Sequence, residues 1–151
     1  MEITVEERLT GRQLRTQILE KYGTLGRLKA AAAKKGAYEA KDDLADMRLL
    51  EDDPKRLDQH FRIVTVTELA PEELSKLTIE RMRLLHFIAS SKTPPNVTRL
   101  AARLKRDKKN ISEDLVVLEG LGLIRAKRKG REKEIRASGT EIRIVLAAAS
   151  A

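Results

Sequence analysis

The residues best suited to chemistry in this 151-residue chain are basic, and they are concentrated in one stretch. Residues 97–136 contain 13 lysines and arginines against 6 acids, a net charge of +7, while the whole chain carries +8. Ammonium and guanidinium groups clustered in this way neutralise phosphates and release counterions from a nucleic acid. The expected chemistry is therefore the binding of a polyanion.

Within this stretch, polar side chains begin a predicted helix at Lys108–Gly120. Lys108, Lys109 and Asn110 form its first turn, and Ser112 lies one turn further on. Long donors in the N-terminal half of a helix can reach base edges in a DNA groove, and the positive end of the helix dipole favours nearby phosphates. This pattern is typical of a helix that reads duplex DNA.

Such a helix must be anchored by its other face and positioned by its neighbours. Ile111, Leu115 and Leu118 recur at spacings of four and three and form the expected buried face, and Asp107 is the expected N-cap. Gly122 is suited to a left-handed C-terminal cap.

A shorter helix is predicted immediately before it, at Val97–Leu104, and a basic turn at Lys105 and Arg106 joins the two. A short helix, a tight turn and a longer helix with a basic start form a helix-turn-helix arrangement. Upstream, Thr78 is expected to cap a helix whose apolar face includes Leu85 and Ile88.

Downstream, two short strands around Gly130 predict a β-hairpin with a basic tip. A third strand, Glu141–Leu146, alternates polar and apolar residues. It is expected either to close this small sheet or to pair with a partner chain.

Together these segments resemble winged helix regulators of the MarR and ArsR kind. The likeness is carried by the run from Thr78 to Ile124, which ends in Leu118-Glu119-Gly120-Leu121-Gly122-Leu123-Ile124. With the strands on either side included, the chain also resembles a small family of archaeal and bacterial predicted transcriptional regulators, some of which are paired with toxin genes. The resemblance covers residues 63–146 and does not extend to the first sixty residues.

The resemblance implies a role for each group of polar side chains. The expected DNA-recognition residues are Lys108, Lys109, Asn110 and Ser112. Among these types, Asn pairs with adenine in bidentate fashion and Lys prefers guanine or a phosphate. The expected contacts to the DNA backbone are Arg99, Arg103, Lys105 and Arg106. The expected wing contacts are Lys127, Arg128, Lys129, Arg131 and Lys133. Either Glu113 or Asp114 is expected to face the bases or another helix of the protein.

Other classes of function lack the residues that they require. The chain has no Cys, and its two histidines, His60 and His86, are far apart and have no Ser or Asp arranged for nucleophilic catalysis. It has no P-loop, dinucleotide fingerprint or metal-ligand cluster. We therefore expect no enzymatic activity, no catalytic residue, no cofactor and no metal site.

Two further expectations concern partners and location. Aromatic residues make up only 3% of the chain and none lies on the expected wing, which disfavours stacking on RNA bases, although an RNA-binding winged helix stays an alternative. No apolar run is long enough to cross a bilayer, and the first ten residues lack a signal core. No membrane association and a cytoplasmic location are therefore expected.

The first 61 residues are expected to form a helical N-terminal extension. Helices are predicted at Glu6–Tyr22, Leu28–Lys35 and Ala37–Leu50, and a strand follows at Arg62–Thr67. Residues 39–53 hold seven acids against two basic residues. Three hypotheses stay open for this acidic helix: a solvated surface, a docking site for a basic partner such as a nuclease toxin, and a dimer contact through Leu44, Met47 and Leu50.

The expected fold is α+β and mostly helical, with the helical extension at residues 1–61 and a winged helix-turn-helix domain with a small antiparallel sheet at residues 62–151. The expected function is sequence-specific binding of double-stranded DNA by a homodimer, with half-sites about 10 base pairs apart, and repression of transcription by occlusion. The alternatives are an antitoxin-like regulator that binds a basic protein through its N-terminal helices, and the RNA-binding module.

Overall fold

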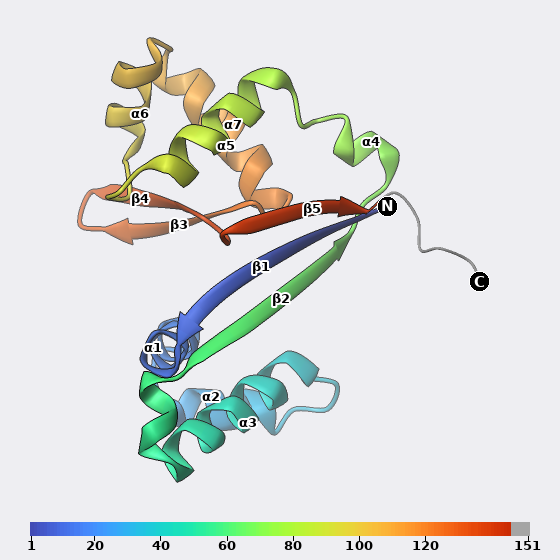
Figure 1. Cartoon of the computed structure of the whole chain (residues 1–151), viewed down its shortest axis with the longest axis vertical. Helices are drawn as coiled ribbons and strands as arrows, with labels where there is room; N and C mark the ends of the chain where they lie inside the picture. The colour runs from blue at the N-terminus through green and yellow to red at the C-terminus, as the bar shows by residue number, and fades with distance from the viewer. Residues whose placement is uncertain (146–151) are drawn as a thin grey trace. The chain divides into compact units, whose positions relative to one another are not determined.

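Figure 1 shows the computed structural model of the chain, in which residues 1–145 are described. Helices account for 53% and the strands form small antiparallel sheets, so the predicted α+β, mainly helical class is confirmed. The helices are α1 (Gly11–Tyr22), α2 (Leu25–Ala32), α3 (Tyr38–Asp52), the 3-10 helix η1 (Pro54–Asp58), α4 (Pro71–Leu74), α5 (Ile79–Ser90), α6 (Val97–Leu104) and α7 (Lys108–Gly120). The strands are β1 (Glu2–Thr10), β2 (His60–Glu68), β3 (Ile124–Lys129), β4 (Glu132–Ala137) and β5 (Glu141–Val145).

The chain divides into two compact units, and it passes from one to the other twice. Residues 8–63 form one of them, the helical unit. Residues 1–7 join the segment that begins at Val64, and we call these residues, up to 145, the C-terminal unit. The single boundary expected between residues 61 and 62 falls near the second crossing, whereas the first crossing was not foreseen.

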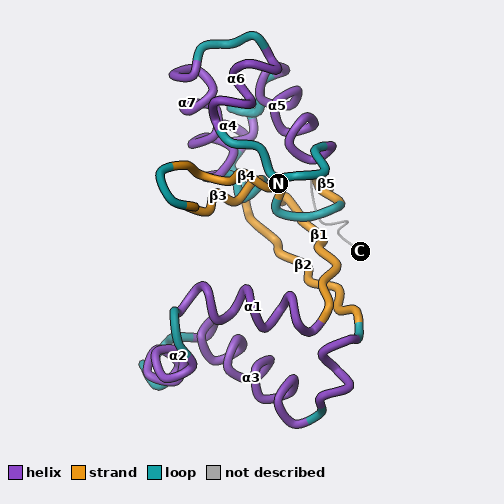
Figure 2. Tube along the Cα trace, turned by 90° about the vertical axis from the view of Figure 1, so that its left-hand side faces the viewer, coloured by secondary structure: helices purple, strands orange, loops and turns teal. Residues whose placement is uncertain are grey.

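The helical unit contains α1, α2, α3 and η1. Figure 2 shows α1 and α3 running side by side, with α2 seen nearly end-on beside them. Its core consists of Ile18, Leu28, Ala32, Ala40 and Met47, with Leu44 and other partly buried side chains packed against it.

This core bears on one of the hypotheses for α3. Met47 is 1% exposed and Leu50 is 2% exposed within the chain itself, and Leu44 is half-buried. Met47 and Leu50 therefore offer almost no apolar surface to a second copy, whereas part of Leu44 stays accessible. A dimer contact that uses all three residues is disfavoured.

Helix α1 begins five residues later than predicted, because β1 extends to Thr10. The Thr10 side chain accepts a hydrogen bond from the backbone of Gln13, and the Gln13 side chain accepts one from the backbone of Thr10. This reciprocal capping box fixes the start of the helix at Gly11. A side chain on Gly11 would collide with the carbonyl of Arg56, so the glycine permits the close approach of η1.

The C-terminal unit has a separate core made by helices α5, α6 and α7, which lie on one side of the β3–β4 hairpin (Figure 1). The fully buried side chains of this core are Ile3, Leu84, Leu100, Ile111, Leu118, Leu123 and Ile135. Ile3 comes from β1, so the first residues of the chain complete a core that is otherwise built from residues after 63.

Strand β5 does not close the small sheet of the hairpin, one of the two pairings expected for it, and pairing with a partner chain stays a prediction. The strand runs antiparallel to β1, with Ile3 opposite Ile144 and Val5 opposite Ile142, in a sheet of order β2-β1-β5. The hairpin β3–β4 forms a separate two-stranded sheet. Leu146, the last residue of the predicted strand, lies outside the described residues.

Apolar matching with β1 explains this pairing. Ile3 and Val5 are buried, and Ile142 packs against the same core. Gly139 lets the chain pass close to β1 on its way from β4 into β5, because a side chain there would collide with the carbonyl of Glu6.

Within residues 1–145, no helix combines the length and the apolar character needed to traverse a bilayer.

Candidate nucleic-acid interface

The turn between α6 and α7 is held by caps at both of its ends. Helix α6 ends at Lys105, whose φ of 52° is left-handed, and the backbone N–H of Arg106 donates to the carbonyl of Ala101 at 3.0 Å. Asp107 then caps α7, its carboxylate accepting from the backbone N–H of Lys109 at 3.0 Å. The predicted boundaries of α6 and α7 are confirmed, and their caps fix how the two helices meet.

Helix α7 buries one face and exposes a narrow polar stripe. Ile111 and Leu118 are fully buried, whereas Lys109, Ser112 and Val116 are exposed. At about 100° per residue, these three fall on one outward line of the helix. The stripe therefore contains an ammonium donor, a hydroxyl and the Val116 side chain, which is 70% exposed, and the exposed carboxylate of Glu113 lies about 40° from Lys109 on the same face.

Val116 is a surface residue that the sequence reasoning missed. It stands in the run Val116-Val117-Leu118, which looks like core. The signal that could have found it is its spacing of seven from Lys109, which places both on the same side of a helix.

Two other expected recognition residues lie off the centre of this stripe. Asn110 is exposed but sits about 160° around the helix from Ser112, and Lys108 sits about 40° from Ser112 on the other side. Within residues 1–145, the side chains of Lys108, Lys109, Asn110 and Ser112 have no hydrogen-bond or ion-pair partner, so they are available to a ligand.

The two neighbouring acids of α7 have different surroundings. Glu113 is exposed, whereas Asp114 is buried between two arginines. Its carboxylate accepts from Arg81 Nε of α5 at 3.0 Å and from Arg106 of the turn at 2.6 Å. Asp114 therefore faces another part of the protein and ties α5, the turn and α7 together.

This arrangement changes the role expected for Arg106. Its side chain is only 22% exposed and is held by Asp114. Its second terminal nitrogen, Nη1, is buried and has no partner in the described part of the chain. Arg106 thus stabilises the turn from inside the protein, and its guanidinium is not exposed for contact with a phosphate.

The remaining expected backbone-contact residues do lie on the surface. Arg99 and Arg103 are exposed one turn apart on α6, and Lys105 is exposed at the turn. The Arg99 guanidinium makes a long contact with the Thr93 hydroxyl at 3.4 Å. In the described chain, Arg103 and Lys105 have no side-chain partner, so both cations are open to an anion.

The β3–β4 hairpin carries the other basic group. It is antiparallel, with Arg128 opposite Lys133 and Ala126 opposite Ile135, and Gly130 turns at a φ of 64°. Because alternate residues share a face, the face that buries Ile135 also carries Arg128 and Lys133 toward the tip. Among residues 1–145, Arg131 and Lys133 have no side-chain partner.

The opposite face of the hairpin is partly neutralised. Glu134 pairs with Lys129 at 3.0 Å and with Arg136 at 3.8 Å. Glu132 accepts from the amide of Asn96 at 2.7 Å, and Asn96 is also the N-cap of α6. The hairpin tip is thereby tied to the start of α6, and both basic groups belong to one unit.

Two acids of α3, Glu39 and Asp43, are engaged inside the helical unit. Asp43 accepts from the Tyr22 hydroxyl at 2.7 Å and from the Lys21 ammonium at 3.0 Å, and Lys21 also contacts Glu39. Burial lowers the pKa of Lys21, but the two acids outweigh it and raise that pKa above its usual value. Burial, then Asp43 and Asp42, raise the pKa of Asp46. If α3 binds a basic protein partner, the acids that stay exposed for that contact are Asp42, Glu51 and Asp52.

The comparisons with known proteins cover the same region as this interface. Residues 76–144 are similar to a protein family described as HVO_A0114. The matched segment starts just before α5 and ends within β5, so it includes α6, the turn, α7 and the hairpin. Among curated proteins, none matches this sequence.

Proposed function

We propose that the C-terminal unit is a winged helix that binds double-stranded DNA, and that the chain is a transcriptional regulator. The observation that carries the proposal is the combination of α7 and the β3–β4 hairpin in one unit, both with unpartnered cations. Helix α7 is anchored by a buried face and presents a polar stripe, as a recognition helix must. Glu132 and Glu134 partly neutralise one face of the hairpin, whereas Arg131 and Lys133 have no acidic partner in the described residues and keep their charge for a ligand.

In this proposal α7 enters the major groove. Lys109 donates to guanine or to a phosphate, Ser112 exchanges a hydrogen bond with a base edge, and Val116 contacts a thymine methyl group. Arg99, Arg103 and Lys105 contact phosphates beside the groove, and Arg131 and Lys133 contact the backbone or the minor groove. No catalytic step and no cofactor are involved.

One such unit makes too few contacts for tight specific binding, so we propose that the protein acts as a homodimer on two half-sites about 10 base pairs apart. Occlusion of a promoter is the simplest resulting activity, which makes the protein a repressor.

Titration of the full chain against random duplex DNA and single-stranded RNA of equal length, at two salt concentrations, tests the proposal. We expect preference for the duplex and an affinity that falls steeply with salt, because phosphate contacts release counterions. Lys108→Ala and Lys109→Ala should each cost about 1–3 kcal/mol if the side chain touches a base, and less if it touches only a phosphate. Lys34→Ala, in the helical unit, is the matched control.

Preference for RNA would favour the RNA-binding alternative. Duplex affinity that is unchanged in both α7 variants and in an Arg131→Glu variant would remove this surface from consideration.

A further inference from the structure

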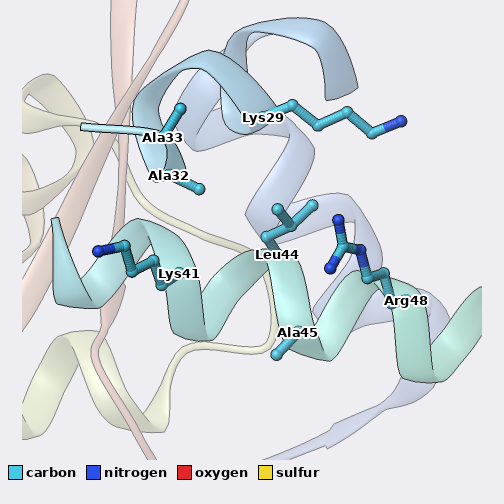
Figure 3. Close-up of a pocket in the computed structure, with 7 residues that line it drawn as sticks. All are labelled: Lys29, Ala32, Ala33, Lys41, Leu44, Ala45 and Arg48. Atoms are coloured by element: carbon cyan, nitrogen blue, oxygen red, sulfur yellow. The ribbon is translucent and has the colours of Figure 1, made fainter. Parts of the chain in front are cut away.

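A hollow of about 410 Å³ lies between α2 and α3 in the helical unit, and none of its lining residues belongs to the interface described above. Figure 3 shows the residues that line it. Its apolar part is formed by Ala32, Ala33, Leu44 and Ala45, and its cations are Lys29, Lys41 and Arg48.

The spacing of these residues explains why the hollow exists. Lys29 and Ala32 of α2 and its C-cap Ala33 follow one another at i, i+3 and i+4, so they share one face. On α3 the same spacing recurs from Lys41 to Leu44 and Ala45, and Arg48 extends it by one turn. Alanine is too small to fill the space between the two facing stripes, so an apolar trough stays open with cations at both ends (Figure 3).

The cations of this trough are not neutralised by the protein. In the described residues, Lys29 and Arg48 have no ion pair, and Lys41 lies over the ring of Tyr38 at 5.8 Å from its centroid. The acids Glu39 and Asp43, on the same helix, instead contact Lys21 of α1. Two acids of α3, Glu39 and Asp43, are therefore engaged with α1, whereas the lining of the trough contains three cations and no acid.

We propose that this trough binds a small amphipathic anion, a molecule with one carboxylate, sulfonate or phosphate on an apolar body. The apolar part of the trough would cover the body of the ligand, and Lys41 or Arg48 would pair with its anionic group. The volume lies in the range of small-molecule sites, about 300–1,000 Å³. A DNA backbone would use the cations but would gain nothing from the alanines and Leu44. The inference is independent of the proposed DNA binding.

The test uses two fluorescent probes with nearly the same apolar body, titrated against the full chain. One is 1-anilinonaphthalene-8-sulfonate, which carries a sulfonate, and the other is N-phenyl-1-naphthylamine, which carries no charge. We expect the sulfonate to bind more tightly. Lys41→Gln and Arg48→Gln should each weaken sulfonate binding by about 2- to 5-fold, the size expected for exposed ion pairs, and should leave the neutral probe unaffected.

Lys34→Gln and Lys35→Gln are the matched controls, because both residues are exposed cations of the same unit that do not line the trough. They should leave both affinities unchanged. All four substitutions are on the surface, and circular dichroism confirms that each variant is folded.

Three outcomes would overturn the proposal. Equal affinity for the two probes would show that charge does not contribute to binding. Equal loss in the control variants would point to net charge alone. Duplex DNA affinity that falls in Lys41→Gln and Arg48→Gln, with sulfonate binding unchanged, would assign these cations to nucleic acid.

Discussion

Asp114 shows how a single side chain can decide the geometry of the proposed interface. Its carboxylate joins Arg81 of α5 to Arg106 of the turn, and all three side chains are mostly buried. Charges removed from water are tolerated only when they are paired, so the loss of the acid would leave two arginines uncompensated. The two ion pairs of Asp114 therefore hold α7 in a fixed position against α5 and the turn.

Asp114→Asn should lower the free energy of unfolding by about 3 kcal/mol, because breaking a buried ion pair is far more costly than losing an exposed one. Urea unfolding followed by circular dichroism measures the change. Glu113→Gln, the exposed acid next to it, should stay within about 0.5 kcal/mol of the parent chain. Similar losses for both substitutions would contradict this role for Asp114.

Lys105 stands where conformation alone would favour glycine. Its φ of 52° is costly for a residue with a Cβ, by about 1–2 kcal/mol. A lysine at such a position is explained if its charge is needed at the turn.

Lys105→Gly should therefore raise the free energy of unfolding by about 1 kcal/mol while weakening DNA binding and reducing the slope of log affinity against log salt by about one. Lys105→Ala removes the charge but retains the Cβ, so it should weaken binding equally without the gain in stability. If the glycine variant binds DNA as tightly as the parent chain, Lys105 makes no phosphate contact.

At the scale of elements, α3 shows the cost of partly burying an acid next to other acids of the same helix. Asp42, Asp43 and Asp46 are spaced at i, i+1 and i+4, and Asp46 is half-buried beside the other two. The fold therefore favours the protonated form of Asp46. Between its ordinary pKa and its raised pKa, the folded state binds more protons than the unfolded state, so stability falls as pH rises through that window.

Asp46→Asn should consequently stabilise the helical unit at neutral pH, by about 0.2–0.5 kcal/mol for each like-charge pair that is removed. The gain should disappear as pH falls below 3.8, the ordinary value for this group, because the parent carboxyl is then neutral in both states. Thermal unfolding at pH 7 and at the lowest pH that preserves the fold measures the difference. A gain that does not change with pH would show that charge is not its cause.

At the scale of the whole molecule, the helical unit is inserted into the C-terminal unit and does not simply precede it. Strand β1 supplies Ile3 and Val5 to the core of the C-terminal unit and pairs with β5, and the chain then leaves and returns along β2. Strands β1 and β2 are hydrogen-bonded neighbours, so a short turn can join them.

A chain in which residues 8–63 are replaced by a two-residue Asn-Gly turn should therefore fold and retain its duplex affinity. Deletion of residues 1–63 should instead unfold the C-terminal unit, because it removes Ile3 and Val5 from the core together with the partner strand of β5. Circular dichroism and the duplex titration distinguish the two. A stable product of the full deletion would contradict the role of β1.

The sequence by itself determined the local features of this protein. The N-caps at Thr78 and Asp107, the left-handed Gly122, the bounds of α6 and α7 and the basic hairpin around Gly130 all depend on neighbouring residues, and each is found where it was predicted. The candidate DNA-binding surface could be predicted for the same reason, because the cations and the spacing of apolar residues that define it lie within forty consecutive residues.

Only the tertiary structure decided which segments meet. The pairing of β1 with β5, the burial of Met47 within its own unit and the engagement of Asp114 by Arg81 all depend on residues distant in the chain. The alternation of residues in a strand predicts which face is apolar, but it does not predict which strand lies beside it. The neighbouring sequence of a charged side chain likewise does not predict its ion-pair partner. Those choices are set by the shared core and by the cost of leaving a charge unpaired away from water.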